Sequence, residues 1–82
     1  MERFIVELTA LNQCGVLNRI TEVYSKHKYN IDTLTAVESD TPGFSFIRIV
    51  SRGDVSMQTR ITRHLRKLMD VKTVLLVQDK NN

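Results

Sequence analysis

The stretch Asn12-Gln13-Cys14-Gly15-Val16-Leu17 stands between an alternating apolar run and a helical pattern, so it predicts a strand-to-helix turn. Gly15 permits a positive φ angle, or a close approach of the backbone to another group. The first amides of the following helix have no partner within the helix and favour an anion such as a carboxylate. Together with the side-chain amide of Asn12, they predict a site for an amino acid. The alternative is a structural turn in which Asn12 caps the backbone and Gly15 relieves strain.

Working outward from this turn, residues 3–9 alternate, and Phe4, Val6 and Leu8 share one side. This period of two predicts a strand whose apolar side is covered by helices. After the turn, residues 16–26 carry apolar side chains at spacings of three and four, which predicts an amphipathic helix of about three turns. The apolar set comprises Val16, Leu17, Ile20, Val23 and Tyr24, and the helix should stop near Lys28.

The rest of the chain contains further strand and helix patterns. Residues 30–38 and 44–51 are rich in β-branched and aromatic side chains and predict two strands. Between them, residues 39–43 form a turn in which Asp40 accepts backbone amides and Gly43 supplies a permissive position. Asp54 is a predicted N-cap, and a last strand is predicted over residues 71–77. The second helix follows from apolar residues at Met57, Ile61, Leu65 and Leu68.

The predicted order is therefore β-α-β-β-α-β over one domain, residues 1–82, with a core of about residues 3–77 and a frayed tail at 79–82. This order suits the α+β class and the ferredoxin-like βαββαβ sandwich, in which a four-stranded antiparallel sheet carries two helices on one face. Many functions share this fold, so function must be argued from sites. A domain of this size buries a modest core, and we expect it to pair into a homodimer or a higher oligomer.

Composition narrows the class of protein. The 82 residues are 41% apolar and 26% charged, values of an ordinary globular domain. No secretory signal and no run of about 18 apolar residues is present, so we expect a cytoplasmic protein without membrane contact. The net charge of +3 is concentrated in a basic stretch, which we interpret as a solvated helix face and not as a nucleic-acid site. That stretch contains Arg60, Arg63, His64, Arg66 and Lys67.

No catalytic or metal-binding constellation emerges from the sequence. Cys14 lies near a helix N-terminus, where a thiol acidifies, but no histidine is placed to act as its base. His27 and His64 are separated from Cys14, and from each other, by whole elements, which argues against a metal site. We expect no cofactor in this chain, and no enzyme activity of its own.

RNA binding has to be weighed because the RNA-recognition motif shares this topology. Residues 42–49, PGFSFIRI, match the Gly and two aromatic positions of its signature but lack the leading base and the closing aromatic. A base-stacking Phe4 would have to point to the open sheet face, which would turn Arg3 and Glu7 toward the helices. The RNA interpretation is therefore the weakest of the alternatives.

The chain resembles the ACT domain, a small-molecule-sensing module, and is most similar to the ACT domain that starts the regulatory small subunit of acetolactate synthase. The resemblance runs from about Arg3 to Val77. It rests on Asn12-x-x-Gly15-Val16-Leu17-x-Arg19, on Tyr29-Asn30-Ile31-Asp32-x-Leu34-Thr35, on Asp40-x-Pro42 and on Lys67-Leu68-x-Asp70-Val71.

The resemblance implies regulation. Such domains pair side by side, and an amino acid (valine, leucine or isoleucine) binds between the turn of one subunit and the second strand of the other. They transmit feedback inhibition to a thiamine-diphosphate-dependent catalytic subunit and activate it when no effector is bound. A stand-alone amino-acid sensor is the alternative function. The implied effector-binding residues are Asn12, Gly15, Val16, Leu17, Asn30 and Ile31.

The third predicted strand suggests a second surface. Its period places Ile47 and Ile49 toward the helices, and Phe44, Phe46 and Arg48 on the open face. Aromatic and arginine side chains are typical of interface hot spots, so we expect these three to contact a partner, the catalytic subunit. Phe46 stands where the resembled family usually has arginine, and the basic residue is displaced to Arg48. The alternative is that the rings pack under a loop or under the C-terminal tail.

Overall fold

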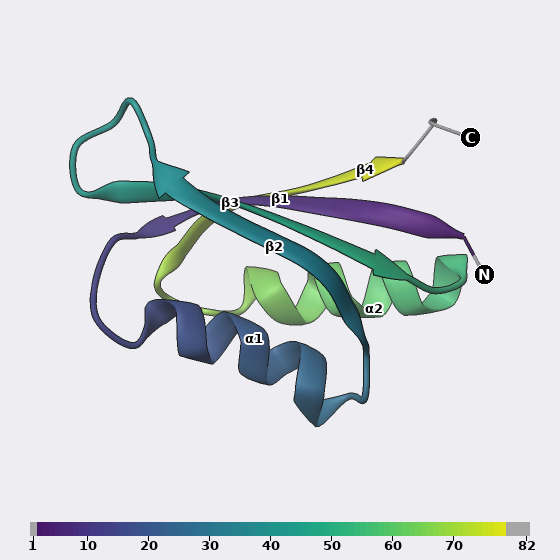
Figure 1. Ribbon diagram of the computed structural model, residues 1–82. Helices are drawn as coiled ribbons and strands as arrows, with labels where there is room; N and C mark the ends of the chain where they lie inside the picture. Colours follow the sequence, from purple (N-terminus) through teal and green to yellow (C-terminus); the bar gives the residue numbers. More distant parts are fainter. Residues whose placement is uncertain (1, 79–82) are drawn as a thin grey trace.

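The computed structural model describes residues 2–78 and contains two layers, a sheet and a pair of helices. Figure 1 shows both helices on the same side of the sheet, running in opposite directions. The strands lie in the order β2-β3-β1-β4, and all three strand pairs are antiparallel. The elements along the chain are β1 (Arg3–Leu11), α1 (Val16–Lys26), β2 (Ile31–Glu38), β3 (Phe44–Arg52), α2 (Val55–Arg66) and β4 (Val71–Gln78).

This arrangement confirms the predicted order and the ferredoxin-like sandwich. Five bounds differ from those expected: β3 and β4 each end one residue later, and the other three are described next. The predicted tail at 79–82 lies outside the described residues. β1 continues to Leu11 because it pairs with Phe44 at the start of β3. β2 begins at Ile31, so Asn30 lies in the loop before it. Leu68 was expected in the second helix but follows it, although its side chain packs against the core.

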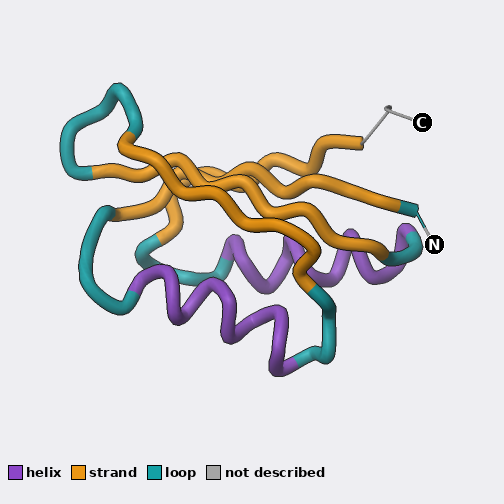
Figure 2. The backbone as a smooth tube through the Cα atoms, viewed as in Figure 1, coloured by secondary structure: helices purple, strands orange, loops and turns teal. Residues whose placement is uncertain are grey.

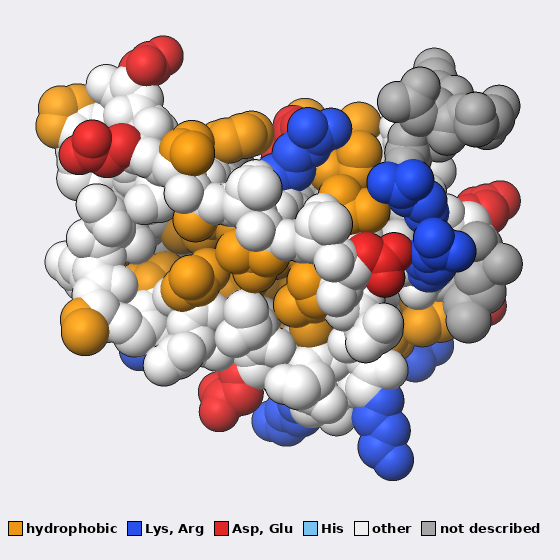
Figure 3. All heavy atoms as spheres, in the orientation of Figure 1, with side chains coloured by type: hydrophobic (Ala, Val, Ile, Leu, Met, Phe, Trp, Pro, Cys, Tyr) orange, Lys and Arg blue, Asp and Glu red, His pale blue; other side chains and the backbone are white. Residues whose placement is uncertain are grey.

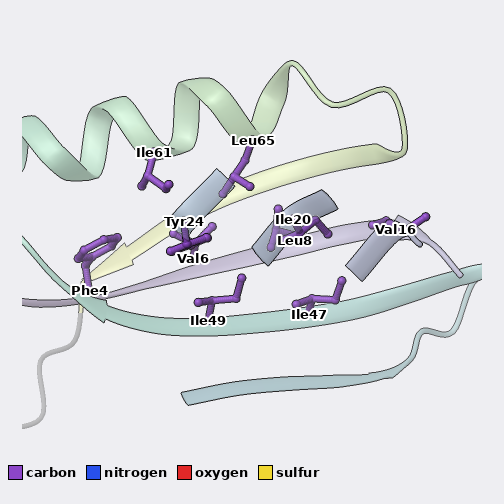
Figure 4. Packing of buried hydrophobic residues seen from close by; sticks show 11 residues of the cluster. Phe4, Val6, Leu8, Val16, Ile20, Tyr24, Ile47, Ile49, Ile61 and Leu65 are labelled. Carbon is purple, nitrogen blue, oxygen red and sulfur yellow. The ribbon is translucent and has the colours of Figure 1, made fainter. Parts of the chain in front are cut away.

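The core lies between the sheet and the helices. Phe4, Val6 and Leu8 point into it and are at most 2% exposed, which confirms the predicted inner face of β1 (Figure 4). Ile5 was expected on the open face, yet it is also buried. Its cross-strand partners are Val50 and Val77. The β-branched side chains of these two neighbours cover much of the surface of Ile5.

The two helices are held to the sheet by apolar faces but begin differently. Ile20 and Tyr24 of α1, and Ile61 and Leu65 of α2, are at most 1% exposed, and Figure 4 shows these side chains pointing toward the sheet. The carboxylate of Asp54 accepts the Met57 amide at 2.9 Å, as predicted for an N-cap. α1 begins at a glycine and has no side-chain cap, so its first amides depend on other partners.

The turn between β2 and β3 corrects one detail of the sequence interpretation. The hydroxyl of Ser39, not the carboxylate of Asp40, accepts the Thr41 amide, at 3.1 Å. Gly43 has the expected positive φ, 86°. RNA binding by base stacking would require Phe4 on the open sheet face, but Phe4 faces the helices and is 2% exposed.

None of the helices within residues 2–78 is long and apolar enough to cross a membrane.

Candidate ligand-binding site

The predicted turn joins β1 to α1 and is fastened at both ends. Gly15 adopts φ 88° at the residue before α1, the left-handed conformation that its lack of a Cβ permits. Its carbonyl accepts the Arg19 amide at 3.1 Å, and the carbonyl of Gln13 accepts the Val16 amide at 3.2 Å. The Asn12 amide donates to the carbonyl of Gly43 at 2.9 Å. The turn is thereby tied to the β2–β3 hairpin, at the same end of the sheet (Figure 2).

A small cleft of about 100 Å³ opens beneath this turn. Three of the predicted effector residues, Asn12, Val16 and Leu17, line it, and Gly15 lies between them in the chain. In Figure 3, apolar side chains gather in a hollowed band between β2 and α1. An apolar pocket with a few polar groups at its rim suits a small amphipathic molecule. The lining residues are Leu11, Asn12, Gln13, Val16, Leu17, Ala36, Ser45 and Ile47.

The other two predicted effector residues are not brought to this cleft. Asn30 and Ile31 follow α1 at the opposite end of the sheet, as the ribbon in Figure 1 shows. Ile31 pairs with Ser51 of β3, whereas Ser45, at the cleft, pairs with Glu38. At the rise of a strand, Ser45 and Ser51 are about 20 Å apart. One copy of the chain therefore holds only half of the predicted site.

β2 lies at an edge of the sheet, with one neighbour only. Most of its side chains are exposed, including Val37, at 58%. Leu17 on the adjacent face of α1 is 41% exposed. An edge strand presents unpaired backbone donors and acceptors, and an apolar border beside it favours pairing with another chain.

The open sheet face carries the three predicted partner residues. Phe46 is 37% exposed and lies between Thr9 and Val37 in the sheet register. The guanidinium of Arg48 pairs with Glu7 of β1, Nε to Oε2, at 3.7 Å. Phe44 is half-buried, and the ammonium of Lys72 lies over its ring, 5.0 Å from the centroid.

The two histidines are separated by whole elements in the chain, yet they meet in the fold. His27 ends α1, His64 lies in the last turn of α2, and their rings stack with centroids 4.3 Å apart. Antiparallel packing alone would place the end of α1 beside the start of α2; the rings meet because α2 is displaced along α1, and Arg19 near the start of α1 therefore reaches Asp70 beyond α2. Arg19 and Asp70 were also missed as a pair: Arg19 Nε donates to Asp70 Oδ2 at 2.7 Å.

Within residues 2–78, no three His, Cys, Asp or Glu side chains are grouped so as to hold a metal ion. Cys14 is exposed beside the turn.

Residues 6–73 match the family described as the AHAS small subunit-like ACT domain. The chain belongs to this family. The ACT domain is 39% identical, over 72 residues, to the acetolactate synthase small subunit of Bacillus subtilis, covering 85% of this chain and 41% of that protein. It is 36% identical, over 67 residues, to the probable acetolactate synthase small subunit of Methanothermobacter thermautotrophicus, covering 82% of this chain and 40% of that protein.

A solved structure agrees with the fold as well as with the family. The acetolactate synthase small subunit from Thermotoga maritima superposes on this ACT domain with a TM-score of 0.87 at 28% identity, covering 93% of this chain and 47% of that chain. This ACT domain thus spans less than half the length of these three relatives.

Proposed function

We propose that this ACT domain acts as the amino-acid-sensing part of an acetolactate synthase small subunit. Its family membership supports the role. The observation that carries the proposal is the division of the predicted site, with Asn12, Val16 and Leu17 at one end of the sheet and Asn30 at the other. On this proposal the domain regulates a catalytic subunit and catalyses nothing itself.

Two copies pair, in this proposal, through their β2 edges. In a two-fold symmetric antiparallel pair, the first residues of β2 in one copy lie opposite the last residues of β2 in the other. Asn30 of one copy then lies beside Glu38 and Ser39 of its partner. That end of β2 carries the hairpin to which the β1–α1 turn is bonded, so two complete sites form per dimer.

The proposed effector is valine or another branched-chain amino acid. The uncapped first turn of α1 offers backbone amides to the carboxylate, and the side-chain amides of Asn12 and the partner copy's Asn30 hold the polar end of the molecule. The apolar cleft receives a small aliphatic side chain between Val16 and Ala36. Its volume of about 100 Å³ favours a branched aliphatic group over an aromatic one.

The test exploits the sharing of each site between two copies. Gly15→Asp places a carboxylate where the effector's own carboxylate binds. Asn30→Ala removes the partner's amide, which weakens binding about ten- to a hundredfold. Each variant alone should lose the rise in melting temperature that valine, leucine or isoleucine gives the wild-type domain. Gly15→Ala is the matched control, because it introduces the same backbone strain without the charge.

Mixing the two variants tests whether each site is shared between two copies. A mixed dimer contains one doubly substituted site and one intact site, so random exchange restores about a quarter of all sites. Calorimetry should show this fraction binding the effector at wild-type affinity. If the mixture binds no more effector than the separate variants do, the site is not shared between copies. If the wild-type domain shows no response to any of the three amino acids, the sensing function itself fails.

We also propose that the open sheet face contacts the catalytic subunit. Phe46 and Arg48 stand exposed at its centre, and neither belongs to the ligand cleft. Phe46→Ala with Arg48→Ala should abolish activation of the catalytic subunit and leave the amino-acid response unchanged. Val55→Ala with Arg60→Ala, which removes an exposed apolar side chain and a cation from α2, is the matched control. Full activation by the first pair would show that this face makes no such contact.

A further inference from the structure

A second and larger cleft, of about 260 Å³, lies between α1 and α2 on the helix layer. None of its lining residues lines the cleft at the β1–α1 turn. Val23 and Leu68 supply apolar surface, and every other lining side chain is charged or titratable. The lining residues are Arg19, Glu22, Val23, Lys26, His27, His64, Lys67 and Leu68.

Positive charge dominates the walls of this cleft and comes from both helices. Lys26 belongs to α1 and Lys67 caps α2, and neither forms an ion pair within residues 2–78. The guanidinium of Arg19 is held by Asp70. Of the described residues that line the cleft, Glu22 is the single acidic one, so the cleft keeps an excess of cations.

Basic residues at the end of a helix ordinarily interact with its free carbonyls. Here the backbone already serves several of them: the Tyr24 carbonyl accepts the Tyr29 amide at 2.8 Å, and the Leu65 carbonyl accepts the Leu68 amide at 3.2 Å. The lysine ammonium groups therefore remain available to a ligand.

His27, which lines this cleft, stacks with two neighbouring rings. The ring of His27 stacks on that of His64 at 4.3 Å and on that of Tyr29 at 5.9 Å between centroids. Partial removal from water, followed by the nearby His27 and the cations of α2, lowers the pKa of His64 from its usual value. The charged form of His64 is therefore disfavoured unless a negative charge joins it.

We infer that the interhelical cleft binds a small phosphate-bearing anion, held between the lysines and histidines of the two helices. A divalent cation does not fit, because the two imidazoles are surrounded by cations and, among residues 2–78, no acidic ligand joins them in a group of three. A phosphate group carries close to two charges and several acceptor oxygens, so it contacts both walls at once. Lys26 and His27 bind it at the end of α1, and His64 and Lys67 bind it at the end of α2.

Binding is coupled to protonation. The anion favours the charged form of His64 and so raises its pKa in the complex. For an anion whose own charge stays constant, affinity therefore increases as pH falls from about 8 to about 6, and protons are taken up on binding. The charged and titratable groups around His64 are Arg19, Glu22, Lys26 and His27 from α1, Tyr29 after it, Arg60, Arg63 and Lys67 from α2, and Asp70 through Arg19.

The experiment titrates the protein with pyrophosphate and with sulfate at constant ionic strength, by calorimetry and by the NMR signals of the imidazole rings. Sulfate does not change its charge in this pH range, so any pH dependence of its binding comes from the protein. Both anions should shift the His27 and His64 signals, and sulfate should bind more tightly at lower pH. Calorimetry in buffers of different ionisation enthalpy should show the proton uptake.

Three substitutions locate the site. Lys67→Gln should weaken binding about fivefold. Lys72→Gln, the same exchange on β4 and outside the cleft, should leave affinity unchanged. Glu22→Gln should strengthen binding, because it removes the acidic side chain from the lining. Equal affinity of the Lys67→Gln and Lys72→Gln proteins would overturn the proposal, and so would the absence of saturable binding to the wild type. Neither result would bear on the amino-acid site, which shares no residue with this cleft.

Discussion

At the scale of single residues, Gly15 shows how one φ angle shapes the turn. Its φ is 88°, and a Cβ added there would lie 3.5 Å from Arg19 Nη1, an ordinary contact. The cost of a side chain is therefore that of the left-handed conformation, about 1–2 kcal/mol. We expect Gly15→Ala to lower the free energy of unfolding in urea by this amount, and Gly15→Asn to lower it less. Equal stability of the alanine variant and the wild type would show that the turn rearranges.

Tyr24 is the second informative residue. It is 1% exposed, burial raises the pKa of its phenol, and its hydroxyl has no hydrogen-bond partner within residues 2–78. A buried hydroxyl without a partner loses its hydrogen bonds to water and gains none within the protein. Tyr24→Phe should therefore leave the free energy of unfolding unchanged or raise it, by up to about 1 kcal/mol. A clear loss of stability would show that an internal water bonds the hydroxyl.

At the scale of elements, the two helices differ in how their N-termini are capped. α2 uses the Asp54 carboxylate as its cap, whereas α1 has none. Asp54→Ala should lower the free energy of unfolding by about 1 kcal/mol and increase amide exchange in the first turn of α2. Asp54→Asn should be nearly neutral, because asparagine caps as well as aspartate. A similar loss in both variants would assign the effect to charge and not to the cap.

At the scale of the whole molecule, packing of the two helices makes stability depend on pH. The pKa of His64 is lower in the folded protein than its usual value of 6.5, so below that pH the unfolded chain binds more protons than the folded protein. Stability should therefore fall as pH decreases from about 7 to about 5. We expect melting temperature to show this slope in the wild type, and a shallower slope in His64→Gln.

The opposite slope would require His64 to be stabilised in its charged form. In the same measurement, sulfate should raise melting temperature more at the lower pH, because it favours the protonated form of His64.

Much of the fold followed from local pattern. The period of Phe4, Val6 and Leu8 correctly predicted the inner face of β1, and the spacing of apolar residues predicted α1, which ends at Lys26 and not near Lys28. Gly15 and Asp54 predicted the turn and the cap because each acts through backbone within a few residues. The grouping of Asn12, Val16 and Leu17 followed for the same reason, since all three belong to one turn.

The sequence by itself thus determined the elements, their order, the buried faces and the turn at Gly15. Only the tertiary structure decided which distant side chains meet: His27 with His64, Arg19 with Asp70, and Ile5 with its two valine neighbours. It also placed Asn30 at the far end of the sheet from Asn12. The physical reason is that periodicity specifies which face of an element is buried, while contacts across elements depend on how far each is displaced along its neighbour. That displacement is set by the packing of the whole core.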